Sequence, residues 1–226
     1  MARGAIPSRR YELSFYSHGY AVLPLDVTLA PGETRDLGEL RLPRGLTIEG
    51  RLLDADGNPV VGRLQVGVRD ERGKLGFRQD LYSYPETDAR GSFKVWGLLP
   101  GRYVLHTTHD EELVRPAQDD PPTEWVSGNV EVSTLGGSVT GLDLHLVKAG
   151  ILVLKGVAAL PAESRCKILD ERGDLLRHSG FYPGFVPRFA LPPGPSTFVL
   201  CDADWREVAR YPLAIVAGLN ELELGR

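Results

Sequence analysis

The sequence predicts an all-β protein of tandem small antiparallel β-sandwiches, with essentially no helix. The first observation is that apolar and polar residues alternate, as in 46–54 and 142–146, a period that is typical of half-buried strands. The second is that turn signals separate such segments about every 8–12 residues, the spacing of sandwiches and barrels. The third is that no segment sustains a helical period, and prolines limit residues 111–122 to one helical turn.

Composition supports a turn-rich globular chain and argues against two classes of partner. The 226 residues include 26 glycines and 17 prolines. With 26 basic and 30 acidic residues the net charge is −4, so we expect no nucleic-acid partner, because proteins that neutralise many phosphates carry a basic excess. No apolar run reaches the roughly 18–20 residues of a membrane helix, so we expect no membrane insertion. The basic N-terminus lacks the apolar region of a signal peptide.

The turns between the predicted strands have recognisable sequences. Segments 56–59, 70–73 and 88–91 each place a side-chain acceptor first and a conformationally permissive residue late, as hairpin turns do. Pro100-Gly101 and Pro193-Gly194 end apolar stretches in a similar way. These turns divide the chain into short strands.

The chain also contains internal repeats. Residues 66–74 (VGVRDERGK) and 165–174 (RCKILDERGD) both predict a strand that leads into an Asp-Glu-Arg-Gly turn. Each is followed by a strand containing phenylalanine, a Pro-Gly turn and another apolar strand. The start of the chain matches only the later part of this pattern, because residues 32–45 align with residues 136–150.

The repeats predict three units. Residues 1–44 form the C-terminal half of a truncated sandwich module, residues 45–149 a full module with a proline-rich insertion near 111–124, and residues 150–226 a shorter, divergent module. A half sandwich has an unpaired sheet edge and little core. We therefore expect residues 10–42 to form strands that upstream sequence or a second chain completes.

The strongest motif match lies in residues 46–108, which resemble the carboxypeptidase regulatory-like domain family of the prealbumin-like (transthyretin-like) sandwich group. The matching positions are Gly50, Leu52, Asp54, Gly57, Pro59, Val60, Thr87, Asp88, Gly91, Phe93, Leu98, Pro100, Gly101, Tyr103 and Leu105. The match is weaker in 150–226. The resemblance implies prealbumin-like sandwiches of the carbohydrate-binding-like fold group, and it favours an extracellular or cell-surface location.

No arrangement of residues predicts catalysis, a metal site or a cofactor. His106 and His109 are three residues apart, so on a strand they would lie on opposite faces, and we interpret them as solvated histidines at a strand end. Residues 54–58 resemble the start of a calcium loop, but the glycine is in the fourth position rather than the sixth, which favours a hairpin turn. We therefore expect a protein that is not an enzyme.

Two further features have simple alternatives. Arg172-Gly173-Asp174 is an integrin-type tripeptide at a predicted hairpin tip, but turn geometry accounts for its first two residues because Arg72-Gly73 occupies the matching turn. Cys166 and Cys201 lie in the last unit, and we expect two buried free thiols, with a disulfide as the alternative.

The remaining candidate binding residues are aromatic. Exposed aromatic platforms bind sugars or peptide surfaces, whereas the alternative is that these rings fill the ends of the sandwiches as core. The candidates are Tyr82, Tyr84, Trp125, Phe181, Tyr182, Phe185 and Trp205.

The predicted function is that of a non-catalytic β-sandwich repeat segment of a larger, secreted or surface protein. It would act as a spacer or as a binding module for carbohydrate or protein surfaces, beside further modules of the same longer chain. Two alternatives stay open. One is an accessory module that folds or positions a neighbouring peptidase or other enzyme, and the other is an intracellular interaction protein, which the absence of a signal peptide favours.

Overall fold

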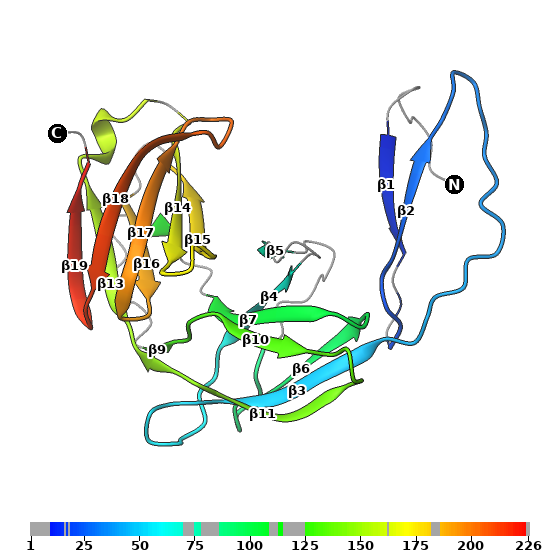
Figure 1. The fold of residues 1–226 in the computed structure, drawn as a ribbon, viewed down its shortest axis with the longest axis horizontal. Coiled ribbons are helices and arrows are strands. Elements are labelled where there is room, and N and C mark those ends of the chain that lie inside the picture. Colours follow the sequence, from blue (N-terminus) through cyan, green and yellow to red (C-terminus); the bar gives the residue numbers. More distant parts are fainter. Residues whose placement is uncertain are drawn as a thin grey trace.

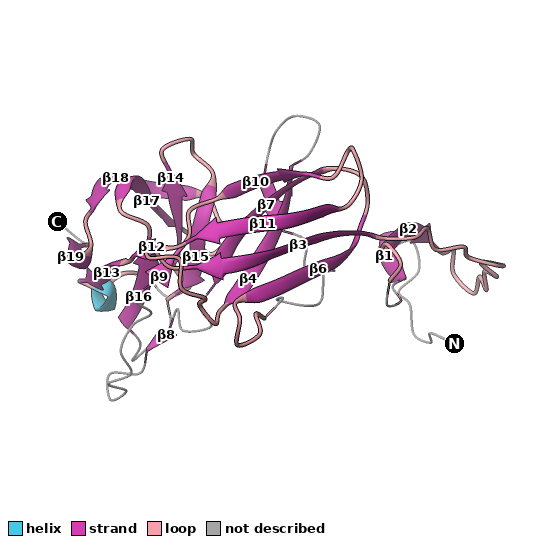
Figure 2. Cartoon of the chain, turned by 90° about the horizontal axis from the view of Figure 1, so that it is seen from below, coloured by secondary structure: helices cyan, strands magenta, loops and turns pink. Residues whose placement is uncertain are grey.

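The computed structural model confirms the predicted fold class. It describes residues 10–15, 17, 19–69, 75–77, 86–108, 113–114, 125–161, 163–181 and 186–224. Within these residues the chain forms small, mostly antiparallel sheets and one short 3-10 turn, η1 (Val157–Ala159) (Figures 1 and 2). None of the described elements is a helix long and apolar enough to cross a membrane.

The middle sandwich consists of a three-stranded and a four-stranded sheet. The first sheet has the order β11 (Val139–His145), β3 (Leu46–Leu53), β6 (Ser92–Leu98), and the second the order β10 (Val130–Ser133), β7 (Arg102–Thr108), β4 (Arg63–Arg69), β5 (Leu75–Phe77). β3 is parallel to β11 and antiparallel to β6. The alternating apolar residues of both sheets face each other, and Ile48, Leu64 and Phe93 are among the buried side chains of their common core.

The last sandwich repeats this topology. Its sheets have the orders β19 (Gly218–Glu223), β13 (Gly150–Lys155), β16 (Val186–Leu191), β8 (Leu113–Val114) and β15 (Leu175–Gly180), β14 (Arg165–Asp170), β17 (Gly194–Cys201), β18 (Glu207–Ile215). β13 is parallel to β19 and antiparallel to β16, as β3 is to β11 and β6. Leu152, Ile168 and Phe198 belong to a second, separate core.

The described strands that flank the two Asp-Glu-Arg-Gly segments have matching places in the two sandwiches. Residues 170–173 connect β14 to β15. Residues 70–73 lie outside the described residues, but β4 ends just before them, and β5 follows. Because β4 and β5 pair as β14 and β15 do, the sequence repeat corresponds to a repeat in strand order.

The described part of the N-terminal region contains a hairpin, and its assignment as half of a truncated sandwich stays a prediction. β1 (Arg10–Phe15) and β2 (Leu23–Thr28) make a two-stranded sheet that stands at one end of the molecule (Figure 1). The expectation of strands continuing to residue 42 is wrong, because the described residues 29–42 contain none. In the sandwiches the matching strands, β11 and β19, pair in parallel with the first strand of their unit, and the described part of this region offers no such partner.

One turn design recurs in the two sandwiches. An aspartate carboxylate accepts hydrogen bonds from the backbone N–H groups two and four residues later, and the fourth residue of the turn has a positive φ. The four aspartates are Asp54, Asp88, Asp170 and Asp202. The hydrogen bonds that Asp54 accepts make residues 54–58 a hairpin turn of this design.

The two cysteines lie on opposite faces of one sheet. Cys166 is opposite Leu200 in the register of β14 and β17 and belongs to the core, whereas Cys201 is opposite Arg165. Residues that face each other across a ladder share a sheet face, so the two sulfur atoms point in opposite directions. Both are buried free thiols, which confirms the expectation for this pair.

Candidate functional site: the junction between the sandwiches

The described aromatic candidates lie in different parts of the fold. Phe181 is 9% exposed and belongs to the core of the last sandwich. Trp125 begins β9 (Trp125–Val126) and packs, half-buried, against the core of the middle sandwich. Trp205 lies in the turn between β17 and β18. The other four candidates, Tyr82, Tyr84, Tyr182 and Phe185, lie outside the described residues.

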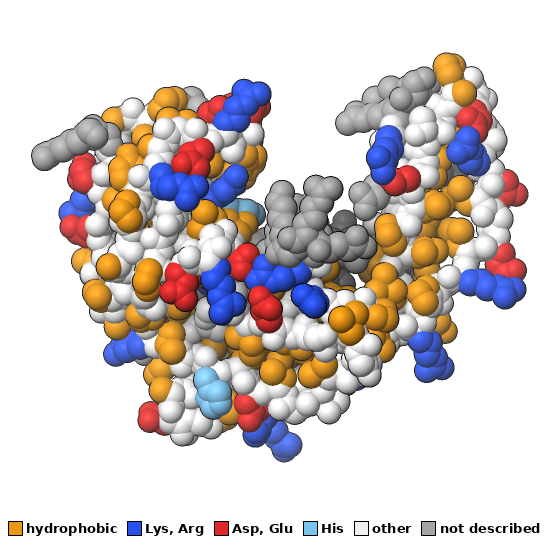
Figure 3. All heavy atoms as spheres, in the orientation of Figure 1, with side chains coloured by type: hydrophobic (Ala, Val, Ile, Leu, Met, Phe, Trp, Pro, Cys, Tyr) orange, Lys and Arg blue, Asp and Glu red, His pale blue; other side chains and the backbone are white. Residues whose placement is uncertain are grey.

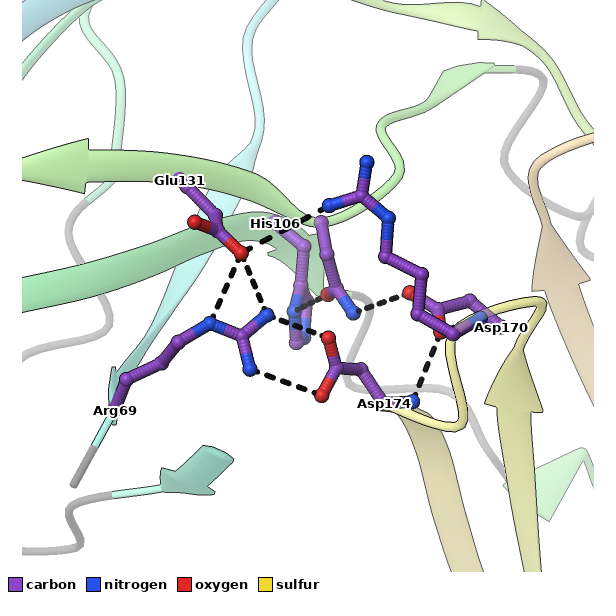
Figure 4. Close-up of polar contacts among 7 residues, drawn as sticks. Arg69, His106, Glu131, Asp170 and Asp174 are labelled. Carbon is purple, nitrogen blue, oxygen red and sulfur yellow. Dashed lines mark hydrogen bonds and ion pairs between the residues drawn. The ribbon is translucent and has the colours of Figure 1, made fainter. Parts of the chain in front are cut away.

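The structure instead brings charged and polar residues together where the two sandwiches meet. Charged side chains gather there on the molecular surface (Figure 3). Only Ala149 separates β12 (Val147–Lys148) of the middle sandwich from β13 of the last. We call the place where the middle and last sandwiches meet the junction. Figure 4 shows that its side chains come from β4, β7 and β10 on one side and from the β14–β15 turn on the other.

An ion pair between Arg69 and Asp174 forms the centre of the junction. Arg69 Nη1 and Nη2 donate to the two carboxylate oxygens of Asp174 over 3.0 and 2.5 Å. The side chains are only 12% and 15% exposed. Arg69 Nε also donates to Glu131 on β10, over 2.9 Å. The two-pronged contact matches the planar guanidinium fork to a carboxylate, so it fixes orientation as well as distance.

These contacts raise the pKa of Arg69 above its ordinary value. The hydrogen bonds that Arg69 donates to Asp174 are the largest cause. The hydrogen bond to Glu131 and the charges of both carboxylates also raise this pKa, whereas partial burial lowers it. Arg69 is therefore a permanent cation.

A second polar chain crosses the junction beside this pair. Asp170 Oδ2 accepts a hydrogen bond from Asn129 Nδ2 over 3.2 Å, while its Oδ1 accepts the turn N–H groups of Arg172 and Asp174. Asn129 Oδ1 in turn lies 3.1 Å from Nδ1 of His106 on β7. One aspartate thus shapes its own turn and attaches that turn to the middle sandwich.

His106 is fully buried in this chain of contacts. Burial, followed by the nearby charge of Arg177, lowers the pKa of His106 to about 3, so the ring is neutral at pH 7. Both ring nitrogens have a polar neighbour, since Nδ1 lies 3.1 Å from Asn129 Oδ1 and Nε2 lies 2.9 Å from Gln65 Oε1. The interpretation of His106 as a solvated strand-end histidine is therefore wrong, and His109 lies outside the described residues.

Arg177 on β15 makes a further connection from the last sandwich. Its side chain is buried, and Nη2 donates over 2.8 Å to the backbone oxygen of Thr107 on β7. Nη1 donates to the backbone oxygen of Leu176 over 2.7 Å. Buried polar groups are costly unless they are hydrogen-bonded, so this arginine belongs to the packing of both sandwiches.

Backbone pairing joins the two units as well. β8 lies in the part of the sequence between β7 and β9, yet it pairs with β16 of the last sandwich, with Val114 opposite Val186 and Leu113 opposite Pro187. A short strand from the insertion predicted near 111–124 thus extends a sheet of the neighbouring unit. The repeat pattern in the sequence does not predict this pairing between the two units.

The integrin-type tripeptide has its aspartate in the junction. The carboxylate of Asp174 is held by Arg69, while Arg172 is 71% exposed and lies 3.9 Å from Glu131. Sequence reasoning treated this turn as a repeated hairpin tip and missed the ion pair. The available signal was a difference between the repeats, since Asp174 stands where the first copy has Lys74.

The charged and polar groups of the junction contact one another across the two sandwiches. Its cation, carboxylates and imidazole are already engaged by each other, so their charges are neutralised within the protein. Among the described residues, no group of three or more His, Cys, Asp or Glu side chains could hold a metal ion. The arrangement can therefore hold two sandwiches at a set angle.

Comparison with solved structures finds similar β-sandwich proteins. The chain is similar to the Bacillus anthracis TIE protein, with 18% identity and a TM-score of 0.30, over 91% of this chain and 39% of that one. It is similar to the streptococcal ancillary pilin, with 12% identity and a TM-score of 0.32, over 96% and 76% of the two chains. For the shaft pilin SpaA from Lactobacillus rhamnosus GG the identity is 10% and the TM-score 0.30, over 79% and 96%.

These similarities are too low to transfer a function or a partner. The chain spans 39% of the length of the TIE protein, and none of the three structures superposes on it as a whole. No protein-family model and no curated protein sequence matches the chain.

Proposed function

We propose that this chain is a non-catalytic spacer whose two sandwiches are held as one stiff unit. The observation that supports this most directly is the bidentate pair between Arg69 and Asp174, two largely buried side chains that are 105 residues apart in the sequence. Domains joined by a small polar interface usually move relative to each other. Here directional contacts oppose that motion.

Three independent connections support the proposal. The Arg69 and Asp170 contacts attach the β14–β15 turn, Arg177 attaches β15 to β7, and β8 attaches the insertion to β16. They act on different strands of the last sandwich, and the linker at Ala149 is one residue long. Rotation about the linker would break all three connections, so bending is expected to be cooperative rather than gradual.

A stiff spacer suits a larger protein that presents one part at a fixed distance from another. The location of that protein at the cell surface, and the presence of further modules in the same chain, are parts of the proposal that rest on the resemblance of residues 46–108 to carboxypeptidase regulatory-like domains. A role in binding carbohydrate or protein surfaces would then be added by individual side chains on the sandwiches.

The stiffness can be tested by measuring distances between the two sandwiches. Val61 and Val208 are 68% and 63% exposed and belong to different sandwiches, so nitroxide labels can be attached to V61C and V208C while the native buried thiols stay unreactive. We expect a narrow distance distribution from pulsed electron resonance. R69A should broaden it, whereas R210A, which removes an exposed pair with Glu207, should not. A broad distribution in the otherwise native chain would overturn the proposal.

A further inference from the structure

The turn at residues 202–206 departs from the other three turns of its design in one residue. In those turns the fourth residue is glycine, at Gly57, Gly91 and Gly173, with φ between 71° and 82°. At the same position the last turn has Trp205, with φ 63°. Only glycine adopts this conformation without steric cost, so a bulky aromatic side chain here strains the backbone. Backbone strain of this kind is concentrated at functional sites, which makes the contacts of the Trp205 ring informative.

The ring of Trp205 lies among basic side chains. Arg165 Cζ is 4.9 Å and Lys167 Nζ is 5.3 Å from the ring centroid, and the ring of His178 is 5.7 Å away. Lys167 Nζ also donates to the backbone oxygen of Trp205 over 3.4 Å. Cations over the face of an indole are attracted by its quadrupole, which favours this placement of the ring.

The register shows on which side of the sheet this cluster lies. Cys166 and Ile168 of β14 point into the core of the last sandwich. Alternation therefore places Arg165 and Lys167 on the opposite, outer face, and His178 joins them there because it is opposite Lys167 on β15. Trp205 is half-buried, so part of this residue is exposed to solvent.

The cluster contains two cations without an ion-pair partner among the described residues, although one carboxylate lies near them. The charge of Lys167 helps to lower the pKa of Glu207, which pairs with Arg210. Two other cations nearby have carboxylate partners, Arg206 with Asp204 and Arg210 with Glu207. Within the described residues, neither Arg165 nor Lys167 forms an ion pair. A guanidinium that stacks through its face keeps the N–H donors at its edge for an anion, and a carboxylate or sulfate oxygen fits these donors.

We propose that Trp205, Arg165 and Lys167 form a binding site for an acidic carbohydrate. The sugar ring would lie against the indole, and its carboxylate or sulfate would pair with the two cations. A peptide is a poorer fit because Asp202 already accepts the turn N–H groups of Asp204 and Arg206, so this turn has few backbone donors to offer a second main chain. The site lies away from the junction and does not depend on it.

The test is a calorimetric titration of the whole chain with defined probes. Oligogalacturonate supplies carboxylates, a heparin-derived hexasaccharide supplies sulfates, and maltohexaose is the neutral control. We expect at least one acidic probe to bind, with affinity that falls as salt rises, and maltohexaose not to bind. The acidic probe that binds shows whether the site takes a carboxylate or a sulfate.

The variant W205G separates binding from folding. Glycine suits the turn, so W205G should unfold at a temperature no lower than the native chain, while its affinity for the acidic probe should fall by about tenfold or more. R165A with K167A should lose binding similarly. R206A, a matched cation of the same turn that is already paired with Asp204, should bind as the native chain does.

Three results would overturn the proposal of a binding site at Trp205. The first is no binding of either acidic probe at millimolar concentration. The second is native affinity in a folded W205G. The third is equal binding of poly-glutamate with the same dependence on Trp205, which would assign the surface to an acidic peptide instead.

Discussion

The chain contains two connections between structural units, and they are built differently. The hairpin β1–β2 reaches the middle sandwich through backbone contacts, such as Ala21 N to the oxygen of Pro43 and Gly45 N to the oxygen of Gly19. The two sandwiches are joined by the buried Arg177, by the largely buried pair of Arg69 and Asp174, and by the pairing of β8 with β16. The first connection is made by backbone contacts, whereas the second also places directional side-chain contacts between two folded bodies.

The connection between the hairpin and the middle sandwich is closely packed at the backbone. A Cβ atom on Gly45 would lie 2.7 Å from Cα of Gly97, so only glycine lets the two backbones approach at this point. The close approach of Gly45 and Gly97 leaves no room for side chains between these two backbones. The proposed stiffness between the sandwiches therefore rests on long-range side-chain pairs and not on the short linker alone.

The largest effect is expected from removing Arg177. R177M would leave the oxygens of Thr107 and Leu176 without this donor in a buried place, and each such loss costs about 1–3 kcal/mol. We expect the free energy of unfolding to fall by about 3 kcal/mol in urea titration. A loss no larger than that of R210A would show that the buried arginine does not hold the two units together.

The Asp174 contact should have a smaller but still clear effect. D174A removes the two-pronged contact of Arg69 and keeps the contact with Glu131, and because the pair is largely buried we expect a loss of about 2 kcal/mol in the free energy of unfolding. A double-mutant cycle with R69A should give a coupling energy well above that of the exposed Glu207–Arg210 pair, for which about 0–1 kcal/mol is typical. Equal coupling in the two pairs would contradict the central role of the junction.

His106 should make stability depend on acid pH. Its pKa in the fold is about 3, below the ordinary 6.5, so between these values the unfolded chain binds a proton that the folded chain does not. Stability from this group is therefore complete above pH 6.5 and falls as the pH decreases, by at most about 1.4 kcal/mol per pH unit. H106Q should flatten this part of the curve, measured as urea midpoints between pH 7 and pH 4. An unchanged slope would mean that the ring is not buried neutral.

The sequence supports prediction of the sandwiches better than of their junction. The motif residues in 46–108 and the repeated turns specify strands and their order, because alternation and turn chemistry are local properties. Arg69 can be explained from its neighbours as the end of a strand, and Asp174 as a turn residue. The sequence around each residue does not predict that the two side chains form a pair. Trp205 is an intermediate case, since its place in a turn that elsewhere has glycine can be read from the aligned segments.

The smallest effect is expected at the other connection. A chain that begins at residue 45 lacks the hairpin but keeps both sandwich cores and every junction contact described here. We expect its free energy of unfolding to stay within about 1 kcal/mol of the full chain, by urea titration monitored through tryptophan fluorescence. A larger loss would show that the hairpin supports the middle sandwich as strongly as the junction does.

The most direct test of the central claim is the tumbling of the two sandwiches in solution. Amide 15N relaxation of the whole chain reports a rotational correlation time for each sandwich separately. A stiff junction predicts one common value and one diffusion tensor for both, and R69A combined with D174A should split them into two. Two different correlation times in the native chain would show that the sandwiches move independently, and the spacer proposal would then be wrong.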